Sequence, residues 1–214
     1  MPAMLERQVA DETMQFLADR ALYWPARRRL LIADLHLGKG DVFRAAGIAV
    51  PTGGTAFDLK RLDVLLHLTE AKELWILGDF LHGARSLAVE IAWKDFLACH
   101  TGLTVSVVSG NHDRALEPAA MRVAILPEDV CDGPFRFRHH PRRAGDTSVQ
   151  HVVCGHLHPV VRLPGLHGRF PAFALHQAQM VLPSFSRFTG GLLVTDAAHR
   201  WIACANGVLV ELPI

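Results

Sequence analysis

The 214-residue sequence has no apolar run near the ~18 residues that cross a bilayer, which predicts no membrane association. Its first residues lack the layout of a secretory signal. The four cysteines form no Cys-x-x-Cys pair, so we expect a reduced, cytoplasmic protein rather than a disulfide framework. Lysine and arginine (22) nearly equal aspartate and glutamate (21), which excludes a generally basic nucleic-acid binder. Aromatic residues make up only 7%, so no stacking platform for single strands is evident.

Hydrophobic residues and histidines are plentiful by comparison. Half of the residues are hydrophobic and 20% are charged, which provides a sizeable core and argues against disorder. The length suits one domain, predicted over residues 1–214. Thirteen histidines accompany a single tyrosine. Histidines that gather in one place would indicate a metal site.

Short apolar runs alternate with helical patterns in the first two-thirds of the chain. Four runs end in glycine or polar residues, as buried strands do: residues 30–33, 74–77, 105–108 and 152–154. Helices are predicted over residues 55–69 and 87–99, the first opening on a weak Thr55-x-x-Asp58 capping box. This alternation is typical of α/β proteins.

The two ends of the chain are predicted to be mainly β. Residues 14–24 have the pattern of a hairpin. Strands are predicted near residues 180–182, 191–195, 201–204 and 208–212, with a turn at Asn206-Gly207. Two packed sheets with helices outside would accommodate both halves of the sequence.

Polar side chains follow the predicted strands at the edge where α/β sheets bind ligands. Asp34 and His36 are two residues apart, so they project the same way from an extended chain. The other candidates are Asp79, then Asn111, His112 and Asp113, and finally His156 and His158. Carboxylate, imidazole and amide ligands suit Mn²⁺, Fe or Zn²⁺ better than Ca²⁺ or Mg²⁺. Each motif alone is common by chance, but all of them in this order predict a metal centre.

These motifs resemble those of the calcineurin-like metallophosphoesterases. The matching segments are Asp34-Leu-His36, Gly78-Asp79, Gly110-Asn111-His112-Asp113 and Gly155-His156-Leu157-His158. The resemblance implies a four-layer αββα sandwich of two mixed sheets and a centre of two divalent metal ions, with manganese expected and iron or zinc as alternatives. Such a pair of metals activates an attacking hydroxide and clamps phosphate oxygens.

The resemblance also assigns roles to individual residues. Asp34, His36 and His158 would bind one metal, Asn111 and His156 the other, and Asp79 would bridge them. A further histidine is required, and the His-x-Pro register at Pro141 favours His139, with His140 left open. His112 would protonate the leaving group, with Asp113 orienting its ring. The stretch Gly78-Asp79-Phe80-Leu81-His82 further resembles the double-strand-break repair nucleases of this superfamily, which implies that His82 lies beside His112.

Longer stretches resemble one bacterial subgroup, the DNA-ligase-associated metallophosphoesterases. These are the segments around Lys39 and Arg44, Val50-Pro-Thr-Gly-Gly, Cys154 to Pro159, and Leu182 to Gly191. The resemblance implies a nuclease acting in DNA repair with an ATP-dependent ligase, a helicase and a second nuclease. Lys39 and Arg44 are candidates for holding substrate phosphates, as are Arg136 and Arg138 beside His139.

Two other functions compete with a nuclease. A small-molecule phosphatase or cyclic-nucleotide phosphodiesterase would use the same metal centre, and His82 together with the subgroup motifs argues against it. A non-catalytic interaction scaffold need not keep the ligands or the acid, whereas this sequence has the full set and His112.

Overall fold

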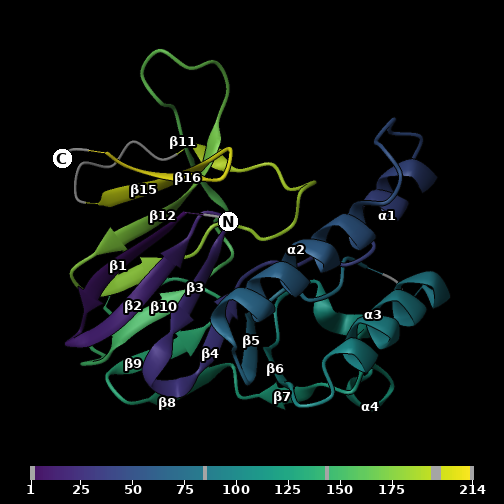
Figure 1. The fold of residues 1–214 in the computed structure, drawn as a ribbon, viewed down its shortest axis with the longest axis horizontal. Coiled ribbons are helices and arrows are strands. Elements are labelled where there is room, and N and C mark those ends of the chain that lie inside the picture. The colour runs from purple at the N-terminus through teal and green to yellow at the C-terminus, as the bar shows by residue number, and fades with distance from the viewer. Residues whose placement is uncertain (1–2, 84–85, 143–144, 194–198, 213–214) are drawn as a thin grey trace.

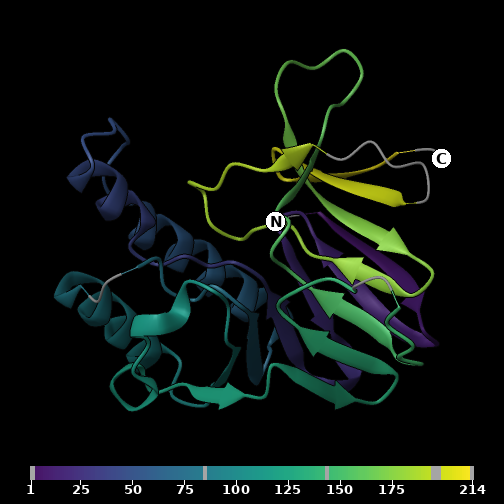
Figure 2. The ribbon, with the colours of Figure 1, turned by 180° about the vertical axis from the view of Figure 1, so that it is seen from behind.

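The computed structural model of the protein describes residues 3–83, 86–142, 145–193 and 199–212. Two β-sheets, of seven and nine strands, pack face to face (Figures 1 and 2). The four α-helices in these residues lie on the side of the first sheet (Figure 1). The predicted α/β sandwich of two mixed sheets is therefore confirmed. Of the four layers expected, the described residues form three, because α1 to α4 all precede the second sheet in the chain and cover the first sheet.

The first sheet starts as an antiparallel meander and continues as a parallel sheet. The meander contains β1 (Met4–Val9), β2 (Glu12–Leu17), β3 (Ala21–Trp24) and β4 (Arg29–Ile32). β5 (Glu73–Leu77), β6 (Thr104–Val108) and β7 (Ala124–Leu126) then add parallel to β4. The predicted hairpin and the first three predicted strands are confirmed.

Helices return the chain between the parallel strands, as βαβ connections require. They are α1 (Lys39–Ala45), α2 (Gly54–Thr69), α3 (Leu87–Cys99) and α4 (Pro118–Met121). Both predicted helices are confirmed as α2 and α3. Leu62, Leu65 and Trp93 are buried in one apolar cluster with Leu30 and Ile76 of the sheet.

The capping box expected at the start of α2 is wrong. The residue before the helix is Gly53, which provides no side-chain cap. The Thr55 hydroxyl instead accepts a hydrogen bond from the Gly38 N–H, and the Asp58 carboxylate pairs with Arg61 and accepts the Arg187 N–H. Both side chains therefore make tertiary contacts instead of capping the helix. These contacts hold α2 against the loops that contain Gly38 and Arg187.

The second sheet contains the remaining strands. They are β8 (Asp129–Asp132), β9 (Phe135–Arg138), β10 (His151–Cys154), β11 (Pro159–Val161), β12 (Phe170–His176), β13 (Gln179–Val181), β14 (Leu192–Leu193), β15 (Arg200–Ala205) and β16 (Val208–Leu212). β10 is parallel to β9 and β13, and β15 and β16 form the predicted hairpin, with positive φ at Asn206 and Gly207. Of the strand predicted over 191–195, residues 192–193 are seen and 194–195 lie outside the described residues.

The apolar core between the two sheets holds the edge of the site in place. Leu31, Trp75 and Leu77 of the first sheet pack with Phe137 and Val153 of the second. Side chains alternate along β4, so Leu30 and Ile32 face the helices while Leu31 faces the other sheet. Within the described residues, no helix has the length and apolar character needed to cross a membrane.

Candidate metal centre

The loops that carry the predicted ligands meet at one edge of the sandwich because the strands before them end at aligned positions in the sheets. Ile32, Ile76 and Val107 are partners across β4, β5 and β6, and Phe137 is the partner of Val153 across β9 and β10. The chain leaves each strand within two residues of these positions. The backbone is then tied across the edge: the His36 N–H donates to the Asp79 carbonyl at 2.7 Å, and the Gly155 N–H donates to the His139 carbonyl at 3.1 Å.

Five of the predicted ligands have left-handed backbone conformations. The φ angles are 54° at Asp34, 48° at His36, 48° at Asp79, 71° at His156 and 48° at His158. Such conformations are unfavourable for residues with a Cβ, by the order of 1 kcal/mol or more each, although Asp and His tolerate them better than most. Their concentration here means that the fold holds these side chains in one arrangement at the expense of local backbone energy.

The first cluster contains Asp34, His36, Asp79 and His158, whose ligand atoms lie within 4.8 Å of one another. His158 Nε2 is 3.4 Å from Asp34 Oδ2, and His36 Nε2 is 3.7 Å from Asp79 Oδ2. Asp34 Oδ1, His36 Nε2 and His158 Nε2 are buried without a hydrogen-bond partner. Buried polar atoms are seldom left unpaired. Orphaned atoms that converge in this way fit a divalent cation.

The second cluster surrounds the Nε2 atom of His139. This atom is 3.1 Å from Asn111 Oδ1, 3.1 Å from His156 Nδ1 and 3.7 Å from Asp79 Oδ2. Asp79 thus contacts both clusters, as a bridging ligand would. Burial lowers the pKa of His36 and of His156, so both imidazoles are neutral at pH 7 and have a lone pair to donate.

The structure places His139 and His140 differently. His139 is buried and its Nδ1 contacts the Leu77 carbonyl at 3.2 Å, which leaves Nε2 toward Asn111 and Asp79. His140 is exposed, and its ring lies 4.3 Å from that of His156. Both histidines belong to a group with His156 whose ligand atoms lie within 4.8 Å. The geometry therefore favours His139 as the ligand without removing His140 from the candidates.

We expect His139→Ala to lose at least ~10-fold in metal affinity, because removing even a residue that only supports a metal ligand lowers the affinity by this much. His140→Ala is the matched control, because it removes the same imidazole one residue away. Metal content after dialysis at limiting Mn²⁺ measures both variants. Loss of metal from His140→Ala alone would move the ligand by one residue.

Three motif glycines are required because the ligand side chains approach their backbone closely. A Cβ on Gly78 would lie 1.9 Å from His139 Nδ1, and one on Gly110 would lie 2.2 Å from Asp79 Oδ1. On Gly155 it would lie 2.8 Å from Asp34 Oδ2. Real Cβ atoms do not approach other atoms so closely, so any larger residue would displace a predicted ligand.

Gly110→Ala is expected to displace Asp79 and to weaken metal binding by ~10–100-fold, the range found when the support of a metal ligand is removed. Gly102→Ala is the matched control, because a Cβ there meets nothing within 4 Å and the residue lacks a positive φ. Metal affinity and thermal unfolding are measured for both. Equal affinity in the two variants would show that Gly110 does not constrain the centre.

The rings of His82 and His112 lie beside the His36 ring of the first cluster. His82 Nδ1 is 3.3 Å from His36 Nδ1, and the His82 ring stacks on the His112 ring with centroids 4.8 Å apart. Burial, with a smaller effect of nearby Lys39, lowers the pKa of His82 to about 4. His82 is therefore neutral at pH 7, and it can accept a hydrogen bond from His36 Nδ1–H while His36 Nε2 faces the cluster.

Asp113 acts on the backbone of two loops. Its Oδ1 accepts the Leu81 N–H and its Oδ2 accepts the Gly110 N–H, both at 2.9 Å. The His112 N–H in turn donates to Asp79 Oδ1 at 3.0 Å. These bonds fix the loop that carries His112, so the orienting role predicted for Asp113 would operate through the backbone.

The candidate phosphate-binding residues differ in their surroundings. Lys39 is 9% exposed, and its Nζ is 3.4 Å from Thr189 Oγ1 and close enough to the first cluster to influence His36. Arg44 is tied to Asp41 and to the Pro51 carbonyl. Arg136 and Arg138 pair with Asp129, and Arg138 also with Asp146. Lys39 is therefore the candidate whose charge is best placed for a substrate phosphate.

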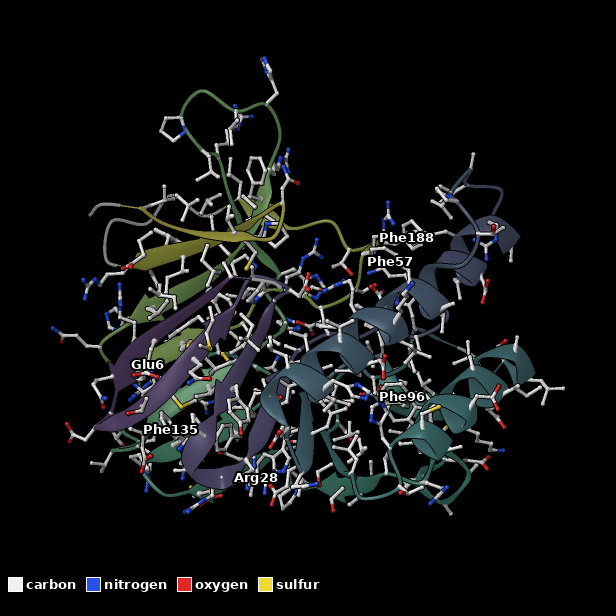
Figure 3. All side chains as sticks on the ribbon, in the orientation of Figure 1. Glu6, Arg28, Phe57, Phe96, Phe135 and Phe188 are labelled. Carbon is white, nitrogen blue, oxygen red and sulfur yellow. The ribbon has the colours of Figure 1, made fainter. Side chains whose placement is uncertain are left out.

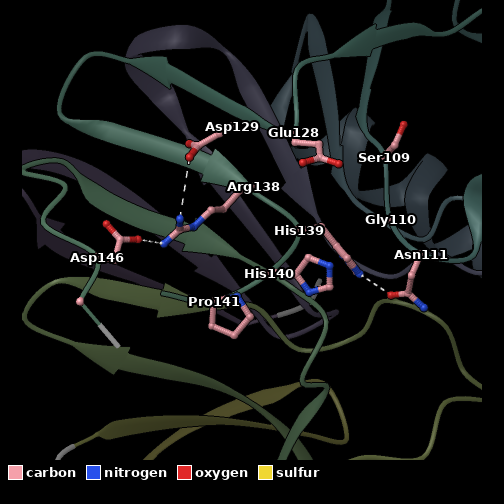
Figure 4. A pocket seen from close by; sticks show the side chains of 11 residues that line it. Ser109, Gly110, Asn111, Glu128, Asp129, Arg138, His139, His140, Pro141 and Asp146 are labelled. Carbon is pink, nitrogen blue, oxygen red and sulfur yellow. Dashed lines mark hydrogen bonds and ion pairs between the residues drawn. The ribbon is translucent and has the colours of Figure 1, made fainter. Parts of the chain in front are cut away.

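A hollow of about 630 Å³ opens beside the second cluster (Figure 4). Asn111, His139 and His140 line one side, and acidic residues with Arg138 line the other. The acidic residues, Glu128, Asp129 and Asp146, were not predicted from the sequence, because they belong to no motif. The pairing of β8 with β9 brings Glu128 and Asp129 to the site, and Asp146 is placed there by its ion pair with Arg138.

The segment after β13 also supports the site and was noted in the sequence only through the subgroup resemblance. The Ser184 hydroxyl donates to the Asp34 carbonyl at 3.0 Å, and the Phe185 N–H donates to the Ala33 carbonyl at 2.8 Å. Phe188 contacts Gly54, where a Cβ would lie 2.2 Å from its ring. Figure 3 shows Phe188 beside Phe57 at one end of α2.

Comparison with solved structures found proteins that are similar to this chain. No protein-family model and no curated protein matches the chain. The crystal structure of Pseudomonas putida nuclease MPE is similar with a TM-score of 0.85 and 36% sequence identity, over 98% of this chain and 100% of that chain. Two similarities are far weaker. Yfce, a phosphoesterase from E. coli, has a TM-score of 0.43 and 17% identity over 83% of this chain and 88% of that chain. AQ665, a protein of unknown function from Aquifex aeolicus, has a TM-score of 0.42 and 18% identity over 61% and 78%.

The similarity to the Pseudomonas putida protein covers 98% of this chain, and the clustered aspartates and histidines in this structure are able to form a dinuclear metal site. The chain therefore belongs to the metallophosphoesterase family and is a metal-dependent hydrolase of the phosphoesterase type.

Proposed function

We propose that the protein is a nuclease that hydrolyses phosphodiester bonds in DNA with a pair of divalent metal ions. The observation that carries this proposal is the contact of one carboxylate, Asp79, with both ligand clusters beside the His82–His112 pair. The 36% identity to a nuclease over 98% of this chain supports a nucleic acid as the substrate, and the motifs of the ligase-associated subgroup favour DNA.

The residues present fit two cations. The first would be held by Asp34, His36 and His158, and the second by Asn111, His139 and His156, with Asp79 between them. When bound, such a pair supplies positive charge that attracts the phosphodiester and polarises its phosphorus–oxygen bonds. The nitrogen and oxygen ligands, without cysteine, suit manganese, with iron or zinc as alternatives.

The other side chains supply what the cations do not. His112, half-buried and stacked on His82, would give a proton to the departing oxygen. Asp113 fixes the loop of His112, and His82 holds the His36 ring with Nε2 toward the cluster. Lys39 adds a positive charge where a phosphate would lie.

The decisive experiment compares substrates under Mn²⁺. We expect cleavage of DNA and of bis-p-nitrophenyl phosphate, and little hydrolysis of the monoester p-nitrophenyl phosphate. Chelator-treated protein is the control and should be inactive. Efficient hydrolysis of the monoester without cleavage of DNA would instead identify a small-molecule phosphatase, and inactivity toward all three with both metals bound would favour a non-catalytic scaffold.

A role in DNA repair is proposed as well, with an ATP-dependent ligase, a helicase and a second nuclease as partners in the cytoplasm. It is supported by the subgroup motifs, including the Leu182–Gly191 segment that braces Asp34. Co-purification of the tagged chain with the ligase from its own cells would support it. Recovery of the chain without the ligase, under conditions that preserve ligase complexes, would contradict it.

Lys39→Gln is expected to raise the KM for DNA and to reduce the salt dependence of binding by about one unit of slope, because one phosphate contact is lost. Lys60→Gln is the matched control, since Lys60 is exposed on α2. Binding isotherms at several salt concentrations measure both variants. An unchanged slope for Lys39→Gln would remove Lys39 from the phosphate contacts.

A further inference from the structure

Three side chains of the types that bind metals lie together near the carboxyl ends of α2 and α3. Asp63 and His67 lie one turn apart on α2, and His100 directly follows Cys99, the last residue of α3. Their ligand atoms all lie within 4.8 Å of one another. Asp63 Oδ1 is 3.0 Å from His100 Nε2 and 3.2 Å from His67 Nδ1. This Asp63–His67–His100 cluster has no part in the catalytic centre.

One nitrogen of this cluster has no hydrogen-bond partner. His100 Nε2 is buried and makes no hydrogen bond, although Asp63 Oδ1 is only 3.0 Å away. The two atoms therefore lie close together without forming a hydrogen bond. With zinc–ligand bonds of ~2.0–2.1 Å, two ligands of a tetrahedral zinc lie about 3.3 Å apart. The two separations to Asp63 Oδ1 match this value.

The cluster lies far from the catalytic edge. His67 is thirteen residues along α2 from Gly54, which corresponds to ~20 Å of helix. A hollow of about 410 Å³ is lined by His67, His100 and Arg28, and Figure 3 shows Arg28 near the lower edge of the view, well apart from Phe57 and Phe188. A cation bound here would therefore not be one of the catalytic pair.

We propose that Asp63, His67 and His100 form a separate divalent-metal site of the zinc type, with water completing the coordination. Two imidazoles and one carboxylate are a common zinc ligand set. His67 Nδ1 also contacts the Asp63 carbonyl at 2.9 Å, and its side chain is 70% exposed, so the ring can turn to present either nitrogen. The bound metal would join α2 to α3 and stabilise that end of the helical layer.

The test measures zinc content in the full chain. Chelator-treated wild type, His67→Ala and His167→Ala are dialysed against equal low concentrations of Zn²⁺ and examined by elemental analysis. We expect His67→Ala to hold one zinc fewer per chain than wild type, and to show a smaller rise in Tm on addition of zinc. His167, an exposed histidine in the loop before β12, is the matched control and should behave as wild type.

Asp63→Asn provides a second variant, because it keeps the shape of the side chain and removes its charge. It should lose the same zinc equivalent, and both variants should keep their hydrolysis rate with Mn²⁺, since neither residue contacts the catalytic centre. Wild-type zinc content in both variants would overturn the proposal and leave the cluster as an interhelical contact. This outcome is independent of whether the protein cleaves DNA.

Discussion

Asp79→Asn is expected to abolish most of the phosphodiesterase activity and to lower metal content at the same time. The Asp79 carboxylate contacts His36 of one cluster and His139 of the other, so loss of its charge weakens both sites. Removing a group that only supports a metal ligand already lowers metal affinity or activity by ~10–100-fold. Removing the charge of a bridging ligand should therefore lower them by more than ~10²-fold. Elemental analysis and DNA cleavage are measured on the same preparation.

The matched control is Asp41→Asn, which neutralises an exposed carboxylate on α1 only five residues from His36. This variant should keep both metals and its turnover. Two tightly bound metals and normal turnover in Asp79→Asn would show that Asp79 does not bridge the clusters.

His112→Ala is expected to retain the metals and to lose ~10²–10⁴-fold in the rate of DNA cleavage, the usual contribution of a positioned proton donor. The His112 backbone N–H bonds to Asp79, and its ring stacks on His82 rather than entering either cluster. Substitution by alanine keeps the backbone bond and removes only the ring. Metal content and single-turnover rates check both parts of this expectation.

The leaving group separates a proton donor from other roles. The loss in His112→Ala should be largest for DNA, whose departing alkoxide is strongly basic, and much smaller for bis-p-nitrophenyl phosphate, whose p-nitrophenolate hardly needs a proton. His82→Ala is the comparison, because it removes the neighbouring ring. Equal loss on both substrates, with the metals in place, would assign His112 to substrate binding instead. Loss of metal from His112→Ala would make its role structural and make His82 the next candidate for the acid.

The fold class and the positions of the candidate ligands could be predicted from the sequence. Apolar runs such as Leu30 to Ala33 are followed directly by polar residues such as Asp34. Parallel strands whose ends are aligned bring these polar residues to one edge of the sheet. Periodicity also predicts α2 and α3 closely, because each buries a continuous apolar side.

The fine geometry of the site could not be predicted in the same way. The left-handed backbone at Asp34 and His156 depends on contacts between distant loops, such as the bond from the His156 N–H to Asp34 Oδ2. One of the two backbone N–H groups that donate to Asp113 belongs to Leu81, 32 residues away in the sequence. Local patterns contain no signal for such pairings.

The predicted capping box at the start of α2 was wrong for the same reason. Thr55 and Asp58 match a capping box in sequence, yet Gly38 and Arg187 engage their side chains in the folded chain. Tertiary partners therefore overrode a weak local preference, and they did so beside the catalytic edge.

The central claim is that two metals are bound by two clusters that share Asp79. A crystal of the Mn²⁺-loaded protein, measured at the manganese absorption edge, tests it most directly. The account predicts two anomalous peaks at the catalytic edge, one against Asp34, His36 and His158 and one against Asn111, His139 and His156, with Asp79 contacting both. A single peak, or two peaks without Asp79 between them, in protein that cleaves DNA would contradict it.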